Sequence, residues 1–155
     1  MIGSGDGVPQ LKKRADELGL SNMTFLPSVP VDQVNEHVRL LDVCLSTQTD
    51  DLVGWVRTTG KLPLYLANER FIIATDVGEA SWVLPPQMRL AYHGTVDRTY
   101  PRRLAERLRE IALNPSLLDA ARAGPARVRQ HFDARQLSYV LAAELHQLER
   151  RTSDA

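Results

Sequence analysis

The chain has little of what several classes of protein require. Its 155 residues include one cysteine, which excludes an internal disulfide framework and suits a reducing compartment. Nineteen basic and nineteen acidic residues give a formal net charge of zero, so no overall field recruits nucleic acid or an acidic membrane. No apolar run approaches the ~20 residues that span a bilayer, and no basic segment followed by an apolar one indicates a signal peptide. We therefore expect a soluble, cytoplasmic globular protein.

Several kinds of catalytic site are also missing from the sequence. Gly60 and Lys61 suggest a phosphate loop, but Gly54 lies one residue too far upstream, and Leu62 stands where a magnesium-binding Ser or Thr is required. No serine sits in a nucleophile elbow. The arginines between 98 and 109 are typical of a solvated helix face. The histidines are scattered and never at metal-ligand spacing with a cysteine or carboxylate: His37, His93, His131 and His146. We expect no metal and no cofactor.

The most informative stretch runs from residue 57 to residue 79. Residues 61–67 have the length and composition of a helix, and the apolar run 71–74 follows, as in a strand covered on both faces. Residues 75–78 then form a turn at the carboxyl end of that strand, where open α/β sheets bind their ligands.

The rest of the chain alternates between the same kinds of element. The other expected strands are 23–26, 41–45 and 88–92. The other expected helices begin near Pro9, Val31, Glu79, Pro101, Ser116 and Asp133. The last of these carries one apolar stripe, formed by Leu137, Leu141, Leu145 and Leu148. Strands alternating with helices predict an α/β fold with a doubly wound parallel sheet. We expect one domain over residues 1–150 and a disordered tail over residues 151–155.

The chain opens on a glycine-rich turn, Gly3-Ser4-Gly5-Asp6-Gly7. Exposed backbone N–H groups in such a turn can approach a phosphate at the N-terminus of the next helix. The third glycine comes one residue early for the dinucleotide-binding fingerprint. An ordinary strand-to-helix turn explains the glycines equally well.

Three segments of the chain together carry a family resemblance. The turn 2–7 matches a phosphate-side turn, and the helix 61–67, KLPLYLA, matches the pattern K-l-x-E-Y-m-A. The segment 72–78, IIATDVG, matches the strand and turn that follow it. On these segments the chain resembles the C-terminal, donor-binding half of GT-B glycosyltransferases, in the large retaining group-one (family-four) set. The resemblance implies a Rossmann-like doubly wound sheet and extends over nearly the whole chain, including the entry to the last helix at residues 130–133.

The chain departs from that family at four positions. Leu64 stands where the family has a glutamate that holds the donor ribose, and Trp82 lies near a second glutamate position. Glu69 and Phe71 replace a glycine and a proline before the strand. By the same comparison, the first strand and helix of the donor domain and the whole acceptor domain are missing. We therefore expect an incomplete domain, inactive alone, that needs an N-terminal partner or self-associates.

The resemblance implies transfer of a sugar from a nucleotide-diphosphate sugar to an unknown acceptor, with retention of configuration. Two early glycines would let the backbone approach the donor, two cations would neutralise the diphosphate, and a Gly-Glu pair would lie beside the sugar. The expected donor-binding residues are Gly5, Gly7, Arg57, Lys61, Gly78 and Glu79. Lys61 is explained equally well as a surface lysine. A degenerate, non-catalytic domain of the same fold is the alternative, and a generic nucleotide-binding module is a weaker one.

Overall fold

A computed structural model describes residues 1–153. It divides into two compact units, Met1–His37 and Val38–Ala155, and the single domain expected over residues 1–150 stays a prediction. Each unit is described by itself below. Residues 154–155, part of the tail that we expected to be disordered, lie outside the described residues, and the preceding helix continues to Ser153.

The C-terminal unit (residues 38–153) is built on a parallel sheet of three strands. They are β1 (Val43–Ser46), β2 (Phe71–Thr75) and β3 (Arg89–Leu90), in the order β1-β2-β3. Val43 pairs with Phe71, and Ala74 pairs with Arg89. The predicted α/β class with a parallel sheet is confirmed. The predicted strand 88–92 is reduced to its two residues Arg89 and Leu90.

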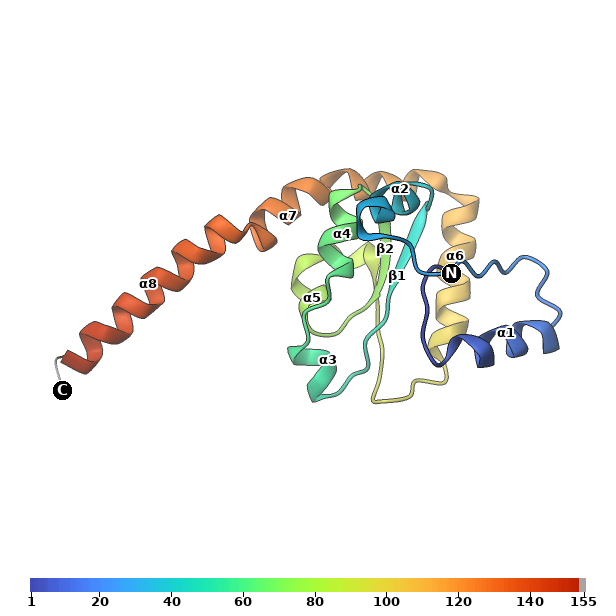
Figure 1. Ribbon diagram of the computed structural model, residues 1–155, viewed down its shortest axis with the longest axis horizontal. Helices are drawn as coiled ribbons and strands as arrows, with labels where there is room; N and C mark the ends of the chain where they lie inside the picture. The colour runs from blue at the N-terminus through green and yellow to red at the C-terminus, as the bar shows by residue number, and fades with distance from the viewer. Residues whose placement is uncertain (154–155) are drawn as a thin grey trace. The chain divides into compact units, whose positions relative to one another are not determined.

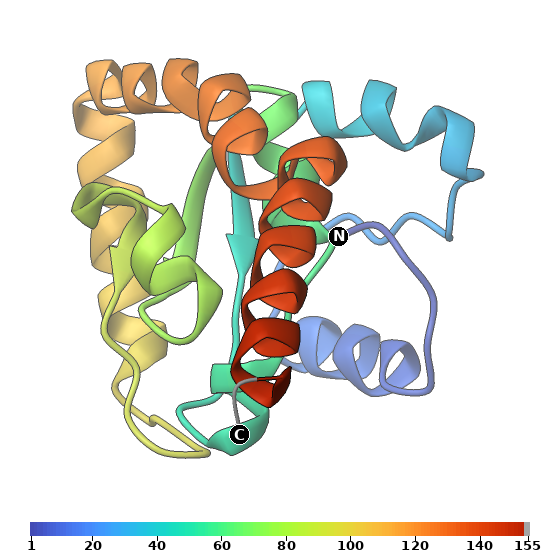
Figure 2. The same ribbon diagram turned by 90° about the vertical axis from the view of Figure 1, so that its left-hand side faces the viewer.

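β2 lies at the centre of the hydrophobic core. All five of its side chains are buried, as an uninterrupted apolar run predicts for a strand covered on both faces. Two helices, α4 (Lys61–Ala67) and α5 (Glu79–Val83), lie on one side of the sheet, and α6 (Tyr100–Leu113) lies on the other (Figures 1 and 2).

The remaining helices of this unit are short, except the last. They are α2 (Val34–Arg39), which crosses the boundary between the units, α3 (Leu52–Val56), α7 (Gly124–Phe132) and α8 (Ala134–Ser153), with 3-10 turns at Pro86–Met88 and Pro115–Ala123. α8 begins as predicted, because the Asp133 carboxylate accepts hydrogen bonds from the backbone N–H groups of Arg135 and Gln136.

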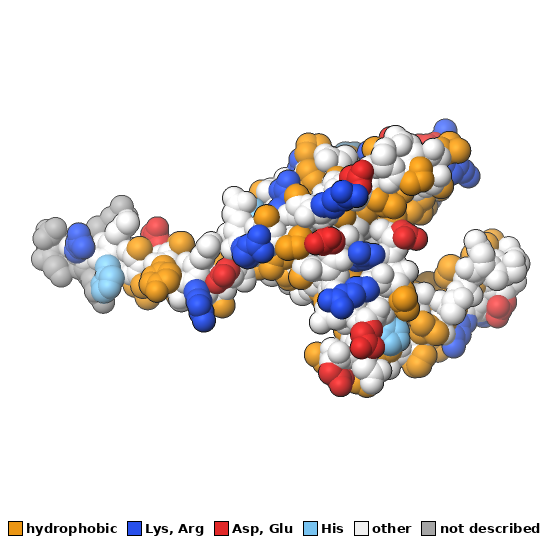
Figure 3. Space-filling view, turned by 90° about the horizontal axis from the view of Figure 1, so that it is seen from above, with side chains coloured by type: hydrophobic (Ala, Val, Ile, Leu, Met, Phe, Trp, Pro, Cys, Tyr) orange, Lys and Arg blue, Asp and Glu red, His pale blue; other side chains and the backbone are white. Residues whose placement is uncertain are grey.

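The predicted apolar stripe of α8 is exposed. More than half of the surface of Leu137, Leu141 and Leu145 is open to solvent, and hydrophobic side chains alternate with charged ones along the helix (Figure 3). The side chain of Leu148 lies outside the described residues.

α4 ends in a Schellman motif. The backbone N–H of Arg70 donates to the carbonyl of Tyr65, and that of Glu69 donates to the carbonyl of Leu66, both at 3.0 Å. Glu69 therefore adopts a φ of 54°, a left-handed conformation that favours glycine. Glu69, which stands where the resembled family has a glycine, therefore places an L-residue at a position whose backbone favours glycine.

The N-terminal unit (Met1–His37) contains α1 (Val8–Glu17) and a short 3-10 turn, Val31–Gln33. The predicted strand 23–26 is reduced to a single parallel bridge between Ile2 and Leu26. Of the side chains predicted on the inner face of α1, Ala15 is buried, whereas Leu11 and Leu18 are about half exposed. This unit therefore has little core of its own.

Candidate functional site

Loops from three parallel strands meet at the carboxyl edge of the sheet in the C-terminal unit. The strands end at Ser46, Thr75 and Leu90, and we call the loops that follow them, residues 47–51, 76–78 and 91–99, the strand-end edge. The backbone N–H of Gln48 donates to Thr75 Oγ1 at 2.8 Å, and that of Asp76 donates to the Leu90 carbonyl at 2.8 Å. This is the position at which open α/β sheets bind ligands.

Gly78 packs backbone against backbone at this edge. Its φ is 57°, and an added Cβ would lie 2.5 Å from the carbonyl oxygen of Gly54 and 3.1 Å from that of Trp55. A Cβ on Gly54 would in turn lie 1.8 Å from the carbonyl oxygen of Thr49. Neither position leaves room for a side chain, so the turn 76–78 and helix α3 are fixed against each other.

The start of α3 is held by Asp51. Its carboxylate accepts hydrogen bonds from the Gly54 backbone N–H at 2.8 Å and from the Thr49 hydroxyl at 2.7 Å. These two bonds, the first above all, lower the pKa of Asp51. The adjacent carboxylate, Asp50, accepts the indole N–H of Trp55 at 2.8 Å. Both aspartates of the polar loop therefore support its structure.

Glu79 is buried, with 9% of its surface exposed. Burial raises the pKa of its carboxyl group, and a hydrogen bond from the backbone N–H of Thr59 partly opposes that increase. Oε2 of Glu79 and the hydroxyl of Thr59 are both buried without a hydrogen-bond partner. We predicted that Glu79 lies beside the donor sugar, and that placement stays a prediction.

Arg57 and Lys61 lie on either side of residues 58–60, which lead from α3 to α4. The side chains of both are exposed. The Gln48 side-chain amide donates to the carbonyl of Arg57 at 3.1 Å, and the Arg57 N–H donates to the Val53 carbonyl at 3.0 Å. Within the part of the chain that the structure describes, neither cation takes part in an ion pair. Two unpaired positive charges are thus available for an anion.

The predicted site residues fall into two groups. Arg57, Lys61, Gly78 and Glu79 belong to the C-terminal unit, where Gly78 packs against the backbone of Trp55, two residues before Arg57. Gly5 and Gly7 belong to the N-terminal unit.

The glycine-rich turn of the N-terminal unit borders a pocket of about 320 Å³. The pocket is lined by Gly3, Ser4, Gly5, Val8, Pro9, Lys12 and residues 25–27. An added Cβ at Gly5 or Gly7 would meet no atom within 4 Å, so the backbone at both is open to approach. The Lys12 ammonium lies 5.9 Å from the centroid of the Phe25 ring.

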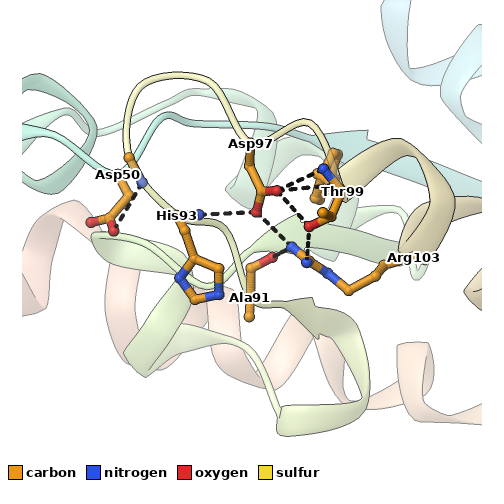
Figure 4. A network of polar contacts seen from close by, with 8 residues as sticks. Asp50, Ala91, His93, Asp97, Thr99 and Arg103 are labelled. Carbon is orange, nitrogen blue, oxygen red and sulfur yellow. Dashed lines mark hydrogen bonds and ion pairs between the residues drawn. The ribbon is translucent and has the colours of Figure 1, made fainter.

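One polar network at the strand-end edge was missed in the sequence. Asp97 accepts hydrogen bonds from the Thr99 hydroxyl and from Arg103 Nη2, both at 2.7 Å, and from the backbone N–H of His93 at 3.1 Å (Figure 4). Thr99 and then Arg103 hold the pKa of Asp97 far below its usual value. Arg103, expected on a solvated face, thus fixes the loop after β3.

A second contact ties this loop to the loop after β1. The backbone N–H of Asp50 donates to the carbonyl of Gly94 at 3.0 Å, and the N–H of Gly94 donates back to the Asp50 carboxylate at 3.4 Å (Figure 4). No local sequence pattern links Asp50 to Gly94, forty-four positions later.

No protein-family model matches the sequence, and no curated protein matches it. Among solved structures, the chain is similar to sucrose-phosphate synthase from Thermosynechococcus elongatus, with a TM-score of 0.70 and 16% sequence identity. The match covers 97% of this chain and 38% of that protein. It shows that the chain has a glycosyltransferase-like fold, with a parallel sheet that matches part of a GT-B C-terminal Rossmann-like domain.

Over residues 1–153, no three His, Cys, Asp or Glu side chains lie grouped so that they could hold a metal ion. No helix in the same part of the chain is long and apolar enough to cross a membrane.

Proposed function

We propose that this chain forms the donor-binding part of a retaining nucleotide-sugar glycosyltransferase of the group-one, family-four type. The observation that carries the proposal is the strand-end edge, where Gly78 packs against the backbone of α3 and two unpaired cations, Arg57 and Lys61, follow that helix in the chain. The glycosyltransferase-like fold supports it.

In this proposal Arg57 and Lys61 bind the diphosphate of the donor. Positive groups that are fixed in place stabilise the charge that develops on a departing diphosphate, which is the electrostatic kind of catalysis. Gly78 lets its turn pack closely against α3, beside the position that the resemblance implies for the sugar. Gly5 and Gly7, in the N-terminal unit, keep the role that the resemblance implies for them, close approach of the backbone to a phosphate, and no atom would crowd a Cβ at either position.

With Leu64 in place of the ribose-binding glutamate, the donor site binds its nucleotide more weakly than the site of the family that the chain resembles. The apolar side chain of Leu64, half-buried on α4, cannot hydrogen-bond a ribose. Affinity then comes mainly from the phosphates, so binding is weak and falls as salt is added.

Calorimetric titration with uridine, guanosine and adenosine diphosphates tests the proposal. Each charge-assisted phosphate contact is worth about 1.5–3 kcal/mol, so we expect Lys61→Ala to weaken binding roughly ten- to a hundredfold. Lys13→Ala, which removes an exposed lysine from α1, is the matched control and should bind as the parent does. Equal binding by the parent and Lys61→Ala would show that Lys61 is a surface lysine.

A non-catalytic domain of the same fold is the second candidate, and Leu64 is the observation that favours it. If the parent binds none of the three diphosphates, this candidate replaces the first.

A further inference from the structure

Helix α3 exposes almost all of its side chains to solvent. Its one buried residue, Gly54, packs against the turn 76–78. The other four residues are large and apolar: Leu52, Val53, Trp55 and Val56. Their exposed fractions run from 52% for Trp55 to 79% for Leu52. With about 3.6 residues per helical turn, the four side chains share the face opposite Gly54, so the contact that fixes α3 also turns its apolar face outward.

The loop after β3 adds a fifth apolar side chain, that of Val96, which is 75% exposed. This loop lies beside α3 at the carboxyl end of the sheet (Figures 1 and 2). The backbone N–H of Asp50, just before α3, donates to the carbonyl of Gly94 at 3.0 Å, which ties the two segments together. We call the five exposed side chains the apolar tip: Leu52, Val53, Trp55, Val56 and Val96.

The free charges around the apolar tip are positive, although the chain as a whole has no net charge. Each of the four aspartates of the strand-end edge already accepts a hydrogen bond or an ion pair: Asp50 from Trp55, Asp51 from Gly54, Asp76 from Arg89 and Asp97 from Arg103. Three cations in or next to the same loops are exposed and, among the described residues, form no ion pair: Arg57, Lys61 and Arg98. The apolar tip therefore suits an anionic surface.

The size and composition of the apolar tip favour a lipid surface over a folded protein. A stable protein interface takes about 20–30 residues from each partner, and the tip supplies five. Lipid binding needs only shallow insertion of a few apolar side chains, with cations that meet anionic headgroups. Trp55 fits that position, because its indole N–H is already bonded to Asp50 at 2.8 Å and tryptophan is enriched at membrane interfaces.

We propose that the apolar tip inserts into the headgroup region of an anionic lipid bilayer and that Arg98 contacts the headgroup phosphates. This inference goes beyond the proposed function and does not rest on it. Arg57 and Lys61 stay assigned to the donor, so Arg98 is the cation on which the lipid contact is tested.

Flotation of the full chain with vesicles measures the binding. One set of vesicles holds phosphatidylcholine and phosphatidylglycerol in equal parts, and the other holds phosphatidylcholine alone. We expect the parent to bind the mixed vesicles more tightly, and Leu52→Ser combined with Val56→Ser to weaken that binding at least about tenfold. Leu113→Ser, at a leucine 87% exposed at the other end of α6, is the control and should bind as the parent does.

Arg98→Ala separates the charge from the apolar contact. One cation near an anionic bilayer contributes about fivefold in affinity, so this variant should bind the mixed vesicles about fivefold more weakly. It should bind the phosphatidylcholine vesicles as the parent does. Arg109→Ala removes an exposed arginine of α6 and is the matched control. Equal binding of the mixed vesicles by Arg98→Ala and the parent would overturn the role of Arg98.

The fluorescence of Trp55 reports insertion directly. The chain has two tryptophans, so Trp82→Phe leaves Trp55 as the only indole. Its emission should shift to the blue on the mixed vesicles and should be quenched by lipids with brominated acyl chains. Emission that the vesicles leave unchanged would overturn the proposal.

Two further results would also overturn it. Equal flotation of the parent and the double serine variant would mean that charge alone holds the chain on the vesicles. A parent that sediments without lipid as a dimer, with the double variant as a monomer, would show that a second copy covers the tip. If the double variant loses the circular dichroism of the folded parent, Val53→Ser is measured in its place and should weaken binding at least about threefold.

Discussion

Replacing Glu69 by glycine should stabilise the protein. Glu69 holds a φ of 54° in the Schellman motif that ends α4, and its side chain is exposed. An L-residue in the left-handed region costs about 1–2 kcal/mol. Glycine removes that cost but loses roughly 0.5–1 kcal/mol more chain entropy on folding. The difference predicts a net gain of about 0.5–1 kcal/mol, or roughly 1–4 °C in Tm for a chain of this size.

Urea unfolding, followed by circular dichroism, measures the effect of this substitution. Glu69→Ala removes the same carboxylate but keeps the Cβ, so it should change stability by no more than about 0.5 kcal/mol. Glu69→Asn should fall between Ala and Gly, because asparagine tolerates the left-handed region. A glycine variant less stable than the alanine variant would show that the φ of Glu69 is not strained.

Two further predictions concern the strand-end edge. Gly78→Ala should destabilise the chain by about 2–4 kcal/mol, because the added Cβ would lie 2.5 Å from the Gly54 carbonyl oxygen. The midpoint of urea unfolding measures this loss. Gly60→Ala is the control and should change the midpoint little, because a Cβ at Gly60 would meet no atom within 4 Å. Equal midpoints for the two variants would contradict the close approach. The second prediction concerns the pH dependence of stability. The fold lowers the pKa of the Asp97 carboxyl group from 3.8. The ionised carboxylate therefore stabilises the folded chain above pH 3.8, and this contribution is lost as the pH falls below that value. The stability difference between the parent and Asp97→Asn should therefore shrink with acidification below pH 3.8, and a difference independent of pH would show that the carboxylate charge is not what holds the loop.

The centre of the fold could be predicted from the sequence because its signals are local. Residues 71–74 are predicted as a buried strand by their unbroken apolar run, and α4 by its composition; both are confirmed, and the strand extends one residue further, to Thr75. The edges could not be predicted in the same way. After Leu90 the carbonyl of Ala91 accepts a hydrogen bond from Arg103 instead of a strand neighbour, so the predicted strand 88–92 stops early.

The candidate site could be predicted in part. The polar turn after a buried strand singled out Gly78, and the cations near a helix start singled out Arg57 and Lys61; their role in binding stays a prediction. The contact between Gly78 and Trp55 joins residues twenty-three positions apart, and the Asp50–Gly94 contact joins residues forty-four apart. Neither leaves a periodic pattern in the sequence, because loop contacts depend on how the elements pack rather than on local propensity.

The most direct test of the central claim is nuclear magnetic resonance of the ¹⁵N-labelled chain, titrated with uridine, guanosine and adenosine diphosphates. If the strand-end edge binds a nucleotide diphosphate, the largest amide shifts should fall in segments 57–61 and 76–79 with at least one of the three, and they should diminish in Lys61→Ala. Shifts confined to other parts of the chain, or none with any of the three, would contradict the account.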